Sequence, residues 1–297
     1  MPNHDHDPDT DPLPAKERLR ALIRSRSDNR GLRFAYKLWQ LRRHHRAARA
    51  KPAEAVRFLL GSREVSNFTY ENANPEEMVR ALATTLAVTP GAIHDCLAEL
   101  DSDRELAEML IARLRPNPLR GDRPLYGYRR ISWCIVRLGK PTSVVECGTH
   151  DGLAASLILR ALQRNAAEGE AGTLHTFDLT PDAGWLIPDS LRPRLSLQIG
   201  DVSELLGPTV ATHGVDFFIE DFGHSFPLKG ELIETALAAA AGPRMIVLTE
   251  CDDNPTLSEI AIRTGGRYDH FREQPLKHWW GGHDWGIASM PTAPAQD

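Results

Sequence analysis

The chain has 297 residues, of which 41% are hydrophobic and 25% are charged, a composition typical of a globular protein and unlike a disordered one. No apolar run is long enough to cross a membrane, and the N-terminus has no basic region followed by an apolar core. Four cysteines lie far apart without a Cys-x-x-Cys pair, which argues against a disulfide framework. We therefore expect a cytoplasmic protein without a membrane partner.

The formal net charge of −5 conceals three regions of different charge. Residues 1–14 contain four Asp and no Lys or Arg, residues 15–57 contain 14 Lys or Arg against three acidic residues, and the remainder is strongly acidic. The basic stretch also carries apolar residues at helical spacing. We expect amphipathic helices that lie against the acidic body or a second subunit, with nucleic acid or a membrane surface as the alternative.

The first half of the chain predicts a disordered tail followed by helices. Residues 1–14 combine four prolines with four aspartates and are expected to be disordered. Asn74-Pro75 and Thr89-Pro90 are typical helix starts, and a third amphipathic segment runs to residue 114. Residues 15–127 are therefore predicted to be an all-helical N-terminal region that covers the active site or forms a dimer interface.

The pattern changes after residue 128 to short β-branched runs alternating with helices. Strands are predicted at 142–147, 173–179, 194–199, 215–219 and 245–249. Two further strands, at 268–273 and 285–290, have no helix between them and must form an antiparallel hairpin. Residues 128–297 are thus predicted to be a catalytic α/β domain with a Rossmann-like, seven-stranded sheet of five parallel strands and a terminal antiparallel hairpin.

Acidic residues follow each of the five predicted parallel strands, where ligands bind in such sheets. They are Glu146, Asp178, Asp201, Glu220 with Asp221, and Glu250 with Asp252 and Asp253. Any single one could be a helix cap or a solvated loop acid, but the complete row suits a cationic, polyhydroxylated ligand.

The turn after the first strand reads Glu146-x-Gly148-x-x-x-Gly152, and glycines let a ligand approach the backbone closely. The turn lacks the third glycine of a dinucleotide fingerprint, and no Gly-Lys-Ser/Thr follows, so it is not a P-loop. Its leading acid would repel a pyrophosphate and suits the ammonium and sulfonium groups of S-adenosylmethionine.

The segments Val144–Gly152, His175–Asp178 and Gly200-Asp201 resemble successive motifs of class I S-adenosylmethionine-dependent methyltransferases. This resemblance implies S-adenosylmethionine as the cofactor. It places the methionine end at Glu146, Gly148 and Gly152, the ribose at Asp178, and the adenine at Asp201 and Val202. Thr149, Asp151 and Glu220 are also expected to line the cofactor site.

The segment Ile219–Ser225 resembles the Asp-x-x-His element of family 24 methyltransferases and of the metal-dependent O-methyltransferases that act on macrolide sugars. The resemblance implies that Asp221 binds a divalent ion such as Mg2+ and that His224 is the catalytic base. Glu250 and Asp252 would complete the metal site. Cys251 interrupts the adjacent acids usual in the family, so the choice among Glu250, Asp252 and Asp253 stays open.

This chemistry has a physical basis that is independent of the resemblance. A protonated alcohol is a poor nucleophile, so methylating it calls for a base with a pKa near neutrality, such as His224. A divalent ion held by Asp221 and neighbouring acids would lower the pKa of the hydroxyl group and orient a diol.

Aromatic residues outside the sheet are expected to contact the acceptor. Tyr126 and Tyr128 directly precede the sheet, and Trp279 and His283 lie in the loop between the last two strands. The loop could instead be a subunit contact.

Together these features predict an O-methyltransferase of a small hydroxylated molecule, a natural product or a sugar, that forms a homodimer and binds no nucleic acid. Three alternatives stay open. The first is the same fold with N-methylation or non-methyl chemistry. The second is an RNA-binding or RNA-modifying protein that uses residues 15–57. The third is a cofactor-binding scaffold without catalysis.

Overall fold

The computed structural model describes residues 30–60, 70–114, 126–222, 226–240, 242–251, 254–275 and 281–291. Within these ranges a single eight-stranded sheet forms the centre of the molecule, in the order β1-β7-β8-β6-β5-β2-β3-β4. No helix within these ranges has the length and apolar character needed to cross a membrane.

Five strands of this sheet are parallel: β2 (Ser143–Cys147), β3 (Thr173–Asp178), β4 (Leu195–Ile199), β5 (Phe217–Glu220) and β6 (Met245–Thr249). The last two strands, β7 (Arg267–Pro275) and β8 (Asp284–Ser289), form an antiparallel hairpin, and β8 also pairs with β6. The five parallel strands and the terminal hairpin confirm the fold predicted from the sequence.

An eighth strand corrects the expectation of seven. Residues 15–127 were expected to be entirely helical, but β1 (Tyr70–Asn72) lies within them and pairs antiparallel with β7, placing Tyr70 opposite Pro275. Three residues are too few to show a period of two, so the strand is set by its partner rather than by its own sequence. It covers the edge that β7 would otherwise expose.

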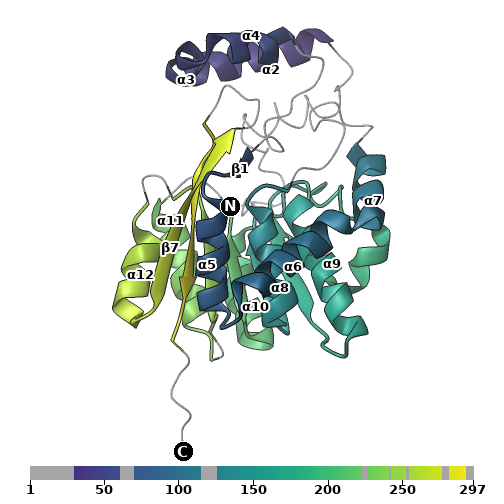
Figure 1. The fold of residues 1–297 in the computed structure, drawn as a ribbon, viewed down its shortest axis with the longest axis vertical. Helices are drawn as coiled ribbons and strands as arrows, with labels where there is room; N and C mark the ends of the chain where they lie inside the picture. Colours follow the sequence, from purple (N-terminus) through teal and green to yellow (C-terminus); the bar gives the residue numbers. More distant parts are fainter. Residues whose placement is uncertain are drawn as a thin grey trace, which may run out of the picture.

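Helices cover both faces of the sheet (Figure 1). One face packs against α5 (Pro75–Thr85), α6 (Pro90–Ser102), α7 (Arg104–Leu114), α8 (Arg129–Gly139) and α9 (Leu153–Ala167). The other packs against α10 (Val202–His213), α11 (Phe226–Leu237) and α12 (Thr256–Thr264). Successive side chains of β2 point to opposite faces of the sheet: Val144 packs into the core on the first face and Val145 into the core on the second. Helices α5–α8 share one core with α9, so packing continues across the predicted boundary between the N-terminal region and the catalytic domain at residues 127 and 128. The boundary stays a prediction.

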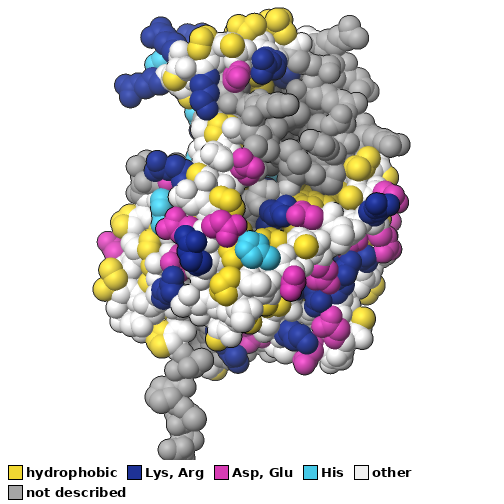
Figure 2. Space-filling model, in the orientation of Figure 1, with side chains coloured by type: hydrophobic (Ala, Val, Ile, Leu, Met, Phe, Trp, Pro, Cys, Tyr) yellow, Lys and Arg dark blue, Asp and Glu magenta, His cyan; other side chains and the backbone are white. Residues whose placement is uncertain are grey.

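Three N-terminal helices form a separate layer near the carboxyl end of β7 (Figure 1). They are α2 (Arg30–Arg43), α3 (His45–Ala50) and α4 (Pro52–Leu60). They are joined by a small core around Ala55 and Phe58, and the buried Lys37 amine donates a 2.8 Å hydrogen bond to the Phe58 carbonyl. Figure 2 shows hydrophobic, Lys and Arg side chains on their surface. Trp39 and Leu38 are about half exposed there.

Candidate active site

The turn between β2 and α9 is tied to β3 and packed against the end of β5. The backbone N–H groups of Gly148 and Thr149 donate to the Phe177 carbonyl at 3.0 and 3.1 Å. Gly148 has φ of +98°, and a Cβ there would lie 2.4 Å from the Asp221 carbonyl oxygen. The glycine is therefore required by close packing within the protein. This packing brings the ends of the first and fourth parallel strands together.

Glu146 lies buried beneath this turn. Its Oε2 atom accepts a 2.8 Å hydrogen bond from the hydroxyl of Thr176, which lies 2.7 Å from the hydroxyl of Thr149. Burial raises the pKa of Glu146 to about 8, although the hydrogen bond from Thr176 opposes the shift. Glu146, Thr176 and Thr149 thus form one buried polar cluster, and the predicted contact of Glu146 and Thr149 with the cofactor stays a prediction.

The other end of the turn starts helix α9. Asp151 is buried, and its Oδ1 atom accepts a hydrogen bond of 3.1 Å from the backbone of Leu153. Gly152 has φ of +88°, and a Cβ there would lie 2.5 Å from the Ile187 side chain. Both predicted residues therefore have defined structural roles in the turn.

Asp178 joins the turns that follow β2 and β3. Its Oδ2 atom accepts from the backbone of His150 at 2.7 Å, and its Oδ1 atom accepts from the backbone of Thr180 at 2.8 Å. The carboxylate is nearly buried and lies at the carboxyl end of β3, where the sequence predicts a ribose-binding acid. Each oxygen keeps a second lone pair that can accept a further hydrogen bond.

Asp201 caps helix α10 by accepting a hydrogen bond of 2.9 Å from the backbone of Ser203. Asp201 is exposed and the next residue, Val202, is buried. The cap accounts for the acid at this strand end and leaves its carboxylate at the surface.

Glu220 is held by a buried lysine that the sequence analysis does not single out. The Nζ atom of Lys229 lies 3.2 Å from Glu220 Oε2 and donates a 2.8 Å hydrogen bond to the Thr249 carbonyl. The backbone of Phe222 donates to Glu220 Oε1 at 2.9 Å. Burial raises the pKa of Glu220 to about 8 against the opposing effect of Lys229. These contacts explain why a carboxylate can be buried at position 220. The predicted role of Glu220 in cofactor binding stays a prediction.

Asp221 accepts hydrogen bonds from two hydroxyl groups. The Tyr128 hydroxyl donates to Oδ2 at 2.7 Å, and the Thr249 hydroxyl donates to Oδ1 at 2.6 Å. Tyr128 directly precedes α8, and Thr249 ends β6. The contacts therefore fix Asp221 between the start of a helix and the neighbouring strand.

A second acidic group lies towards β7 and β8. His283 Nε2 is 3.3 Å from Glu250 Oε1, and the backbone of His283 donates to Glu273 Oε2 at 3.2 Å. Burial raises the pKa of Glu273 to about 7. His283 therefore connects Glu250, at the end of β6, with Glu273, near the end of β7.

Arg129 is surrounded by acidic groups but forms no side-chain hydrogen bond within the described ranges. Its Nε atom is buried without a partner there, and its guanidinium lies 4.7 Å above the ring of Tyr128. Burial would lower the pKa of Arg129, but neighbouring groups raise it by more. These groups are Tyr128, Asp221, Asp151 and Glu273.

Not all predicted site residues can be placed. His224, Asp252 and Trp279 lie outside the described residues. Tyr126 is buried, and burial raises its pKa to about 12. Hydrogen bonds and packing connect Glu146, Tyr128, Asp221 and the glycine turn at the carboxyl edge of the sheet.

Four residues at this edge are missing from the predicted set: Arg129, Lys229, Thr249 and Glu273. Arg129 is adjacent to Tyr128 in the same aromatic and basic stretch, which is the signal that could have identified it. Nothing in the sequence alone pairs Lys229 with Glu220.

The described part of the chain brings no three His, Cys, Asp or Glu side chains together as a metal site. Among the predicted ligands, Asp221 accepts from two hydroxyl groups and Glu250 lies beside His283. Two carboxylates supply only part of the oxygen ligands that a divalent ion such as Mg2+ takes, so these two described residues do not by themselves make a metal site. The third predicted ligand, Asp252, lies outside the described residues.

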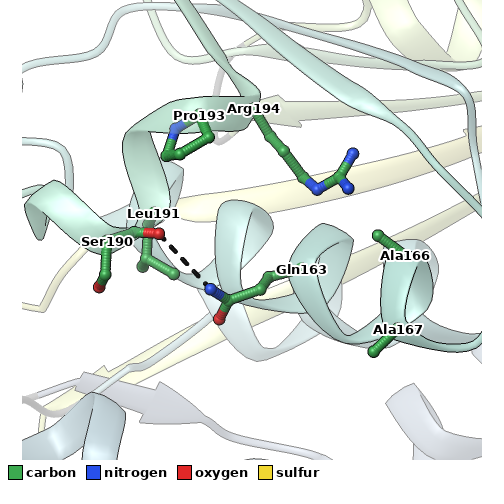
Figure 3. A pocket seen from close by; sticks show the side chains of 7 residues that line it. All are labelled: Gln163, Ala166, Ala167, Ser190, Leu191, Pro193 and Arg194. Carbon is green, nitrogen blue, oxygen red and sulfur yellow. Dashed lines mark hydrogen bonds between the residues drawn. The ribbon is translucent and has the colours of Figure 1, made fainter.

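A separate cavity of about 340 Å3 lies between the C-terminal part of α9 and the 3-10 helix η3 (Asp189–Arg194) (Figure 3). Its lining consists of Gln163, Ala166, Ala167, Ser190, Leu191, Pro193 and Arg194. Because η3 directly precedes β4 and the end of α9 precedes β3, this cavity lies at the amino ends of the strands. It is therefore not part of the acidic site.

Comparisons with known proteins bear on the same region. Residues 145–249, from β2 to β6, match the model of methyltransferase family 24, described as a methyltransferase domain. A comparison with curated proteins gave no match.

Similar solved structures include the O-methyltransferase TomG from Streptomyces achromogenes, involved in tomaymycin synthesis and solved in complex with SAM. It is 16% identical, the alignment covers 64% of this chain and 91% of that chain, and the TM-score is 0.47. Another is the O-methyltransferase from Bacillus cereus in complex with SAH, with 14% identity, coverage of 64% and 92%, and a TM-score of 0.46.

The family match and the strand order identify a class I S-adenosylmethionine-dependent methyltransferase domain of the family 24 type within the chain. The glycine turn, the acids at the strand ends and the orphaned Arg129 Nε atom occur within or beside this domain. They fit a cofactor that carries both positive charge and a carboxylate.

Proposed function

We propose that the protein transfers a methyl group from S-adenosylmethionine to a hydroxyl group of a small molecule, such as a sugar or another natural product. The main support is the acid at the end of β5: Asp221 directly follows this strand, and His224 lies three residues further along the chain. This spacing is the Asp-x-x-His element that resembles the O-methyltransferases.

In this proposal the turn from Gly148 to Gly152 holds the methionine end of the cofactor, with Glu146 beneath it. Asp178 binds the ribose hydroxyls, and Asp201 with Val202 contacts the adenine. When bound, S-adenosylmethionine supplies an activated methyl group. The protein contributes alignment of the acceptor oxygen, which accounts for a large part of the acceleration of such a displacement.

The remaining chemical task is removal of the acceptor proton. His224 would accept the proton of the acceptor hydroxyl as the acceptor oxygen bonds to the methyl carbon and the bond from that carbon to sulfur breaks, so that S-adenosylhomocysteine leaves. Asp221 lies within three residues of His224 and is fixed by Tyr128 and Thr249. We assign Asp221 to positioning in this step, with Tyr126, Tyr128, Trp279 and His283 near the acceptor.

A divalent ion at Asp221, Glu250 and Asp252 is a further part of the proposal that requires its own test. Turnover measured before and after treatment with EDTA decides it. A loss that Mg2+ restores supports metal assistance, and undiminished turnover excludes it.

Isothermal titration calorimetry with S-adenosylmethionine and S-adenosylhomocysteine tests the proposed function directly. We expect both to bind, and an absence of heat with both would overturn the proposal. Candidate hydroxylated metabolites can then be screened by mass spectrometry for a gain of one methyl group. Methylation of amines alone would favour the N-methyltransferase alternative.

We further propose that α2–α4 cover the acceptor site or contact a second copy of the chain. Burial lowers the pKa of His44, and neighbouring Arg43 and His283 lower it further, so the end of α2 lies near the β7–β8 loop. The exposed Trp39 and Leu38 favour a protein contact over nucleic acid. RNA binding that weakens steeply with added salt would instead support the nucleic-acid alternative.

A further inference from the structure

The carboxyl edge of the sheet contains one basic side chain whose hydrogen-bonding capacity is unused in the described residues. Arg129 is the first residue of helix α8, and its Nε atom is buried without a hydrogen-bond partner among the residues that the structure describes. An arginine has five N–H donors, and a buried donor without an acceptor costs free energy. Lys229 differs, because its amine already forms an ion pair with Glu220 and a hydrogen bond to the Thr249 carbonyl.

The surroundings of Arg129 explain its charge but do not satisfy its donors. Acidic groups of Asp221, Asp151 and Glu273 favour the charged guanidinium. In the described part of the chain none of these carboxylates pairs with Arg129: Asp221 accepts from Tyr128 and Thr249, and Glu273 accepts from the backbone of His283. The guanidinium instead rests on the Tyr128 ring, which holds its plane while leaving its edge available.

The methionine end of S-adenosylmethionine is a zwitterion with an ammonium and a carboxylate on the same carbon. The carboxylates of Asp151 and Asp221 can attract the positive groups but would repel the carboxylate of the cofactor. A cation among them is needed to bind both ends, and a guanidinium matches a carboxylate in bidentate geometry.

Resting on the proposed function, we propose that Arg129 binds the α-carboxylate of the methionine part of S-adenosylmethionine. Arg129 thereby distinguishes the intact cofactor from related nucleosides that lack this carboxylate. Tyr128 supports the interaction by stacking under the guanidinium, in addition to its hydrogen bond to Asp221.

The test is a calorimetric comparison of S-adenosylmethionine with decarboxylated S-adenosylmethionine, which keeps the sulfonium and the amine. The wild-type protein is expected to bind the intact cofactor roughly 10- to 100-fold more tightly. Arg129→Gln is expected to lose most of this preference by binding S-adenosylmethionine more weakly. Arg129→Lys, which keeps the charge but not the bidentate geometry, is expected to retain part of it.

Arg130→Gln is the matched control, because Arg130 is the next residue of α8 and its guanidinium is already paired with Asp101 of α6 at 2.7 Å. It is expected to keep the full preference. Thermal unfolding of each variant shows whether the fold is retained, and a misfolded Arg129→Gln leaves Arg129→Lys to decide.

The possible failures are distinct. If Arg129→Gln changes the affinity for both nucleosides by the same factor, the residue only balances the surrounding acids and the inference is wrong. The same holds if the preference survives in that variant. If the wild-type protein binds neither nucleoside, the proposed function fails together with the inference.

Discussion

The hydroxyl group of Tyr128 donates a hydrogen bond of 2.7 Å to the carboxylate of Asp221, although the two residues are 93 positions apart in the chain. The bond connects the helix that precedes the first parallel strand with the end of the fourth. Thr249 donates to the other carboxylate oxygen at 2.6 Å, so both oxygens are oriented by hydroxyl groups. The orientation of Asp221 therefore depends on three separate elements.

Tyr128→Phe removes one of these two donors while keeping the ring beneath Arg129. We expect turnover to fall by up to roughly 100-fold, because a small displacement of a positioned group is enough to lose alignment. The free energy of unfolding should fall by about 1 kcal/mol. Steady-state kinetics and urea unfolding measure the two effects. The control is Tyr268→Phe, which removes a hydroxyl group at the amino end of β7, away from Asp221, and should leave turnover unchanged. Normal turnover in Tyr128→Phe would show that the positioning of Asp221 by Tyr128 is not part of the mechanism.

Asp178→Ala should weaken cofactor binding by about 1–3 kcal/mol through lost hydrogen bonds to the ribose. Because the carboxylate also accepts from the backbones of His150 and Thr180, the variant should be less stable as well. Calorimetry gives the Kd and urea unfolding gives the stability. Asp182→Ala, at an exposed position nearby, is the control. An unchanged Kd in Asp178→Ala would refute the ribose assignment.

His224→Ala should slow turnover roughly 10²–10⁴-fold if this side chain is the base. Cofactor affinity should stay close to that of the wild-type protein, because His224 is assigned to the acceptor side. Single-turnover kinetics with an unmethylated acceptor found in the metabolite screen, and calorimetry with S-adenosylhomocysteine, separate these quantities. Full activity would exclude His224 from the proposed chemistry.

The start of α7 offers a comparison of buried and exposed ion pairs with the same arginine. Asp103 is buried and pairs with Arg160 and Arg164 at 2.8 Å, whereas the exposed Glu105 pairs with Arg160 at 2.7 Å. Asp103→Ala should lower the free energy of unfolding by about 1.5–3 kcal/mol, since it removes a buried carboxylate that accepts hydrogen bonds from both arginines and from the backbone of Leu106. Glu105→Ala should cost less than about 1 kcal/mol. Urea unfolding of the two variants makes the comparison, and equal losses would contradict it.

His175 should make stability depend on pH. It is buried in β3, its ring is stacked 4.4 Å from that of His213, and burial, with a smaller effect of His213, lowers its pKa below 6.5. The unfolded chain therefore binds a proton before the native state does, so stability falls as the pH drops below about 6.5 towards the native pKa. His175→Phe should reduce this dependence.

Urea unfolding at about pH 7.5 and about pH 5.5 measures the difference between the two proteins. A wild-type protein and a His175→Phe variant with the same loss of stability would show that this histidine is not the titrating group.

The parallel part of the sheet could be predicted from the sequence because each strand is a short β-branched run between amphipathic helices. The boundaries were less accurate where local signals conflict with packing. Helix α10, for example, extends to His213 through Gly207 and Pro208, two residues that disfavour a helix. Contacts with β3 and α11 stabilise this extension despite the unfavourable residues.

The acidic positions at the strand ends were likewise predictable, because a parallel sheet brings these ends to one edge. Their partners were not. The pairing of Glu220 with Lys229 and the position of Arg129 depend on how helices lie against the sheet, which no local pattern records. The sequence therefore indicates which charges are present, but not which of them neutralise one another.

The pairing of β1 with β7 also bears on how the protein is made. Gln274 contacts Glu71 across 203 positions of the chain, so the first strand has no partner until almost the whole polypeptide has left the ribosome. A nascent chain that ends before β7 therefore cannot form the pair of β1 and β7, and β1 is joined to the sheet only after the strands β2 to β6 have been synthesised.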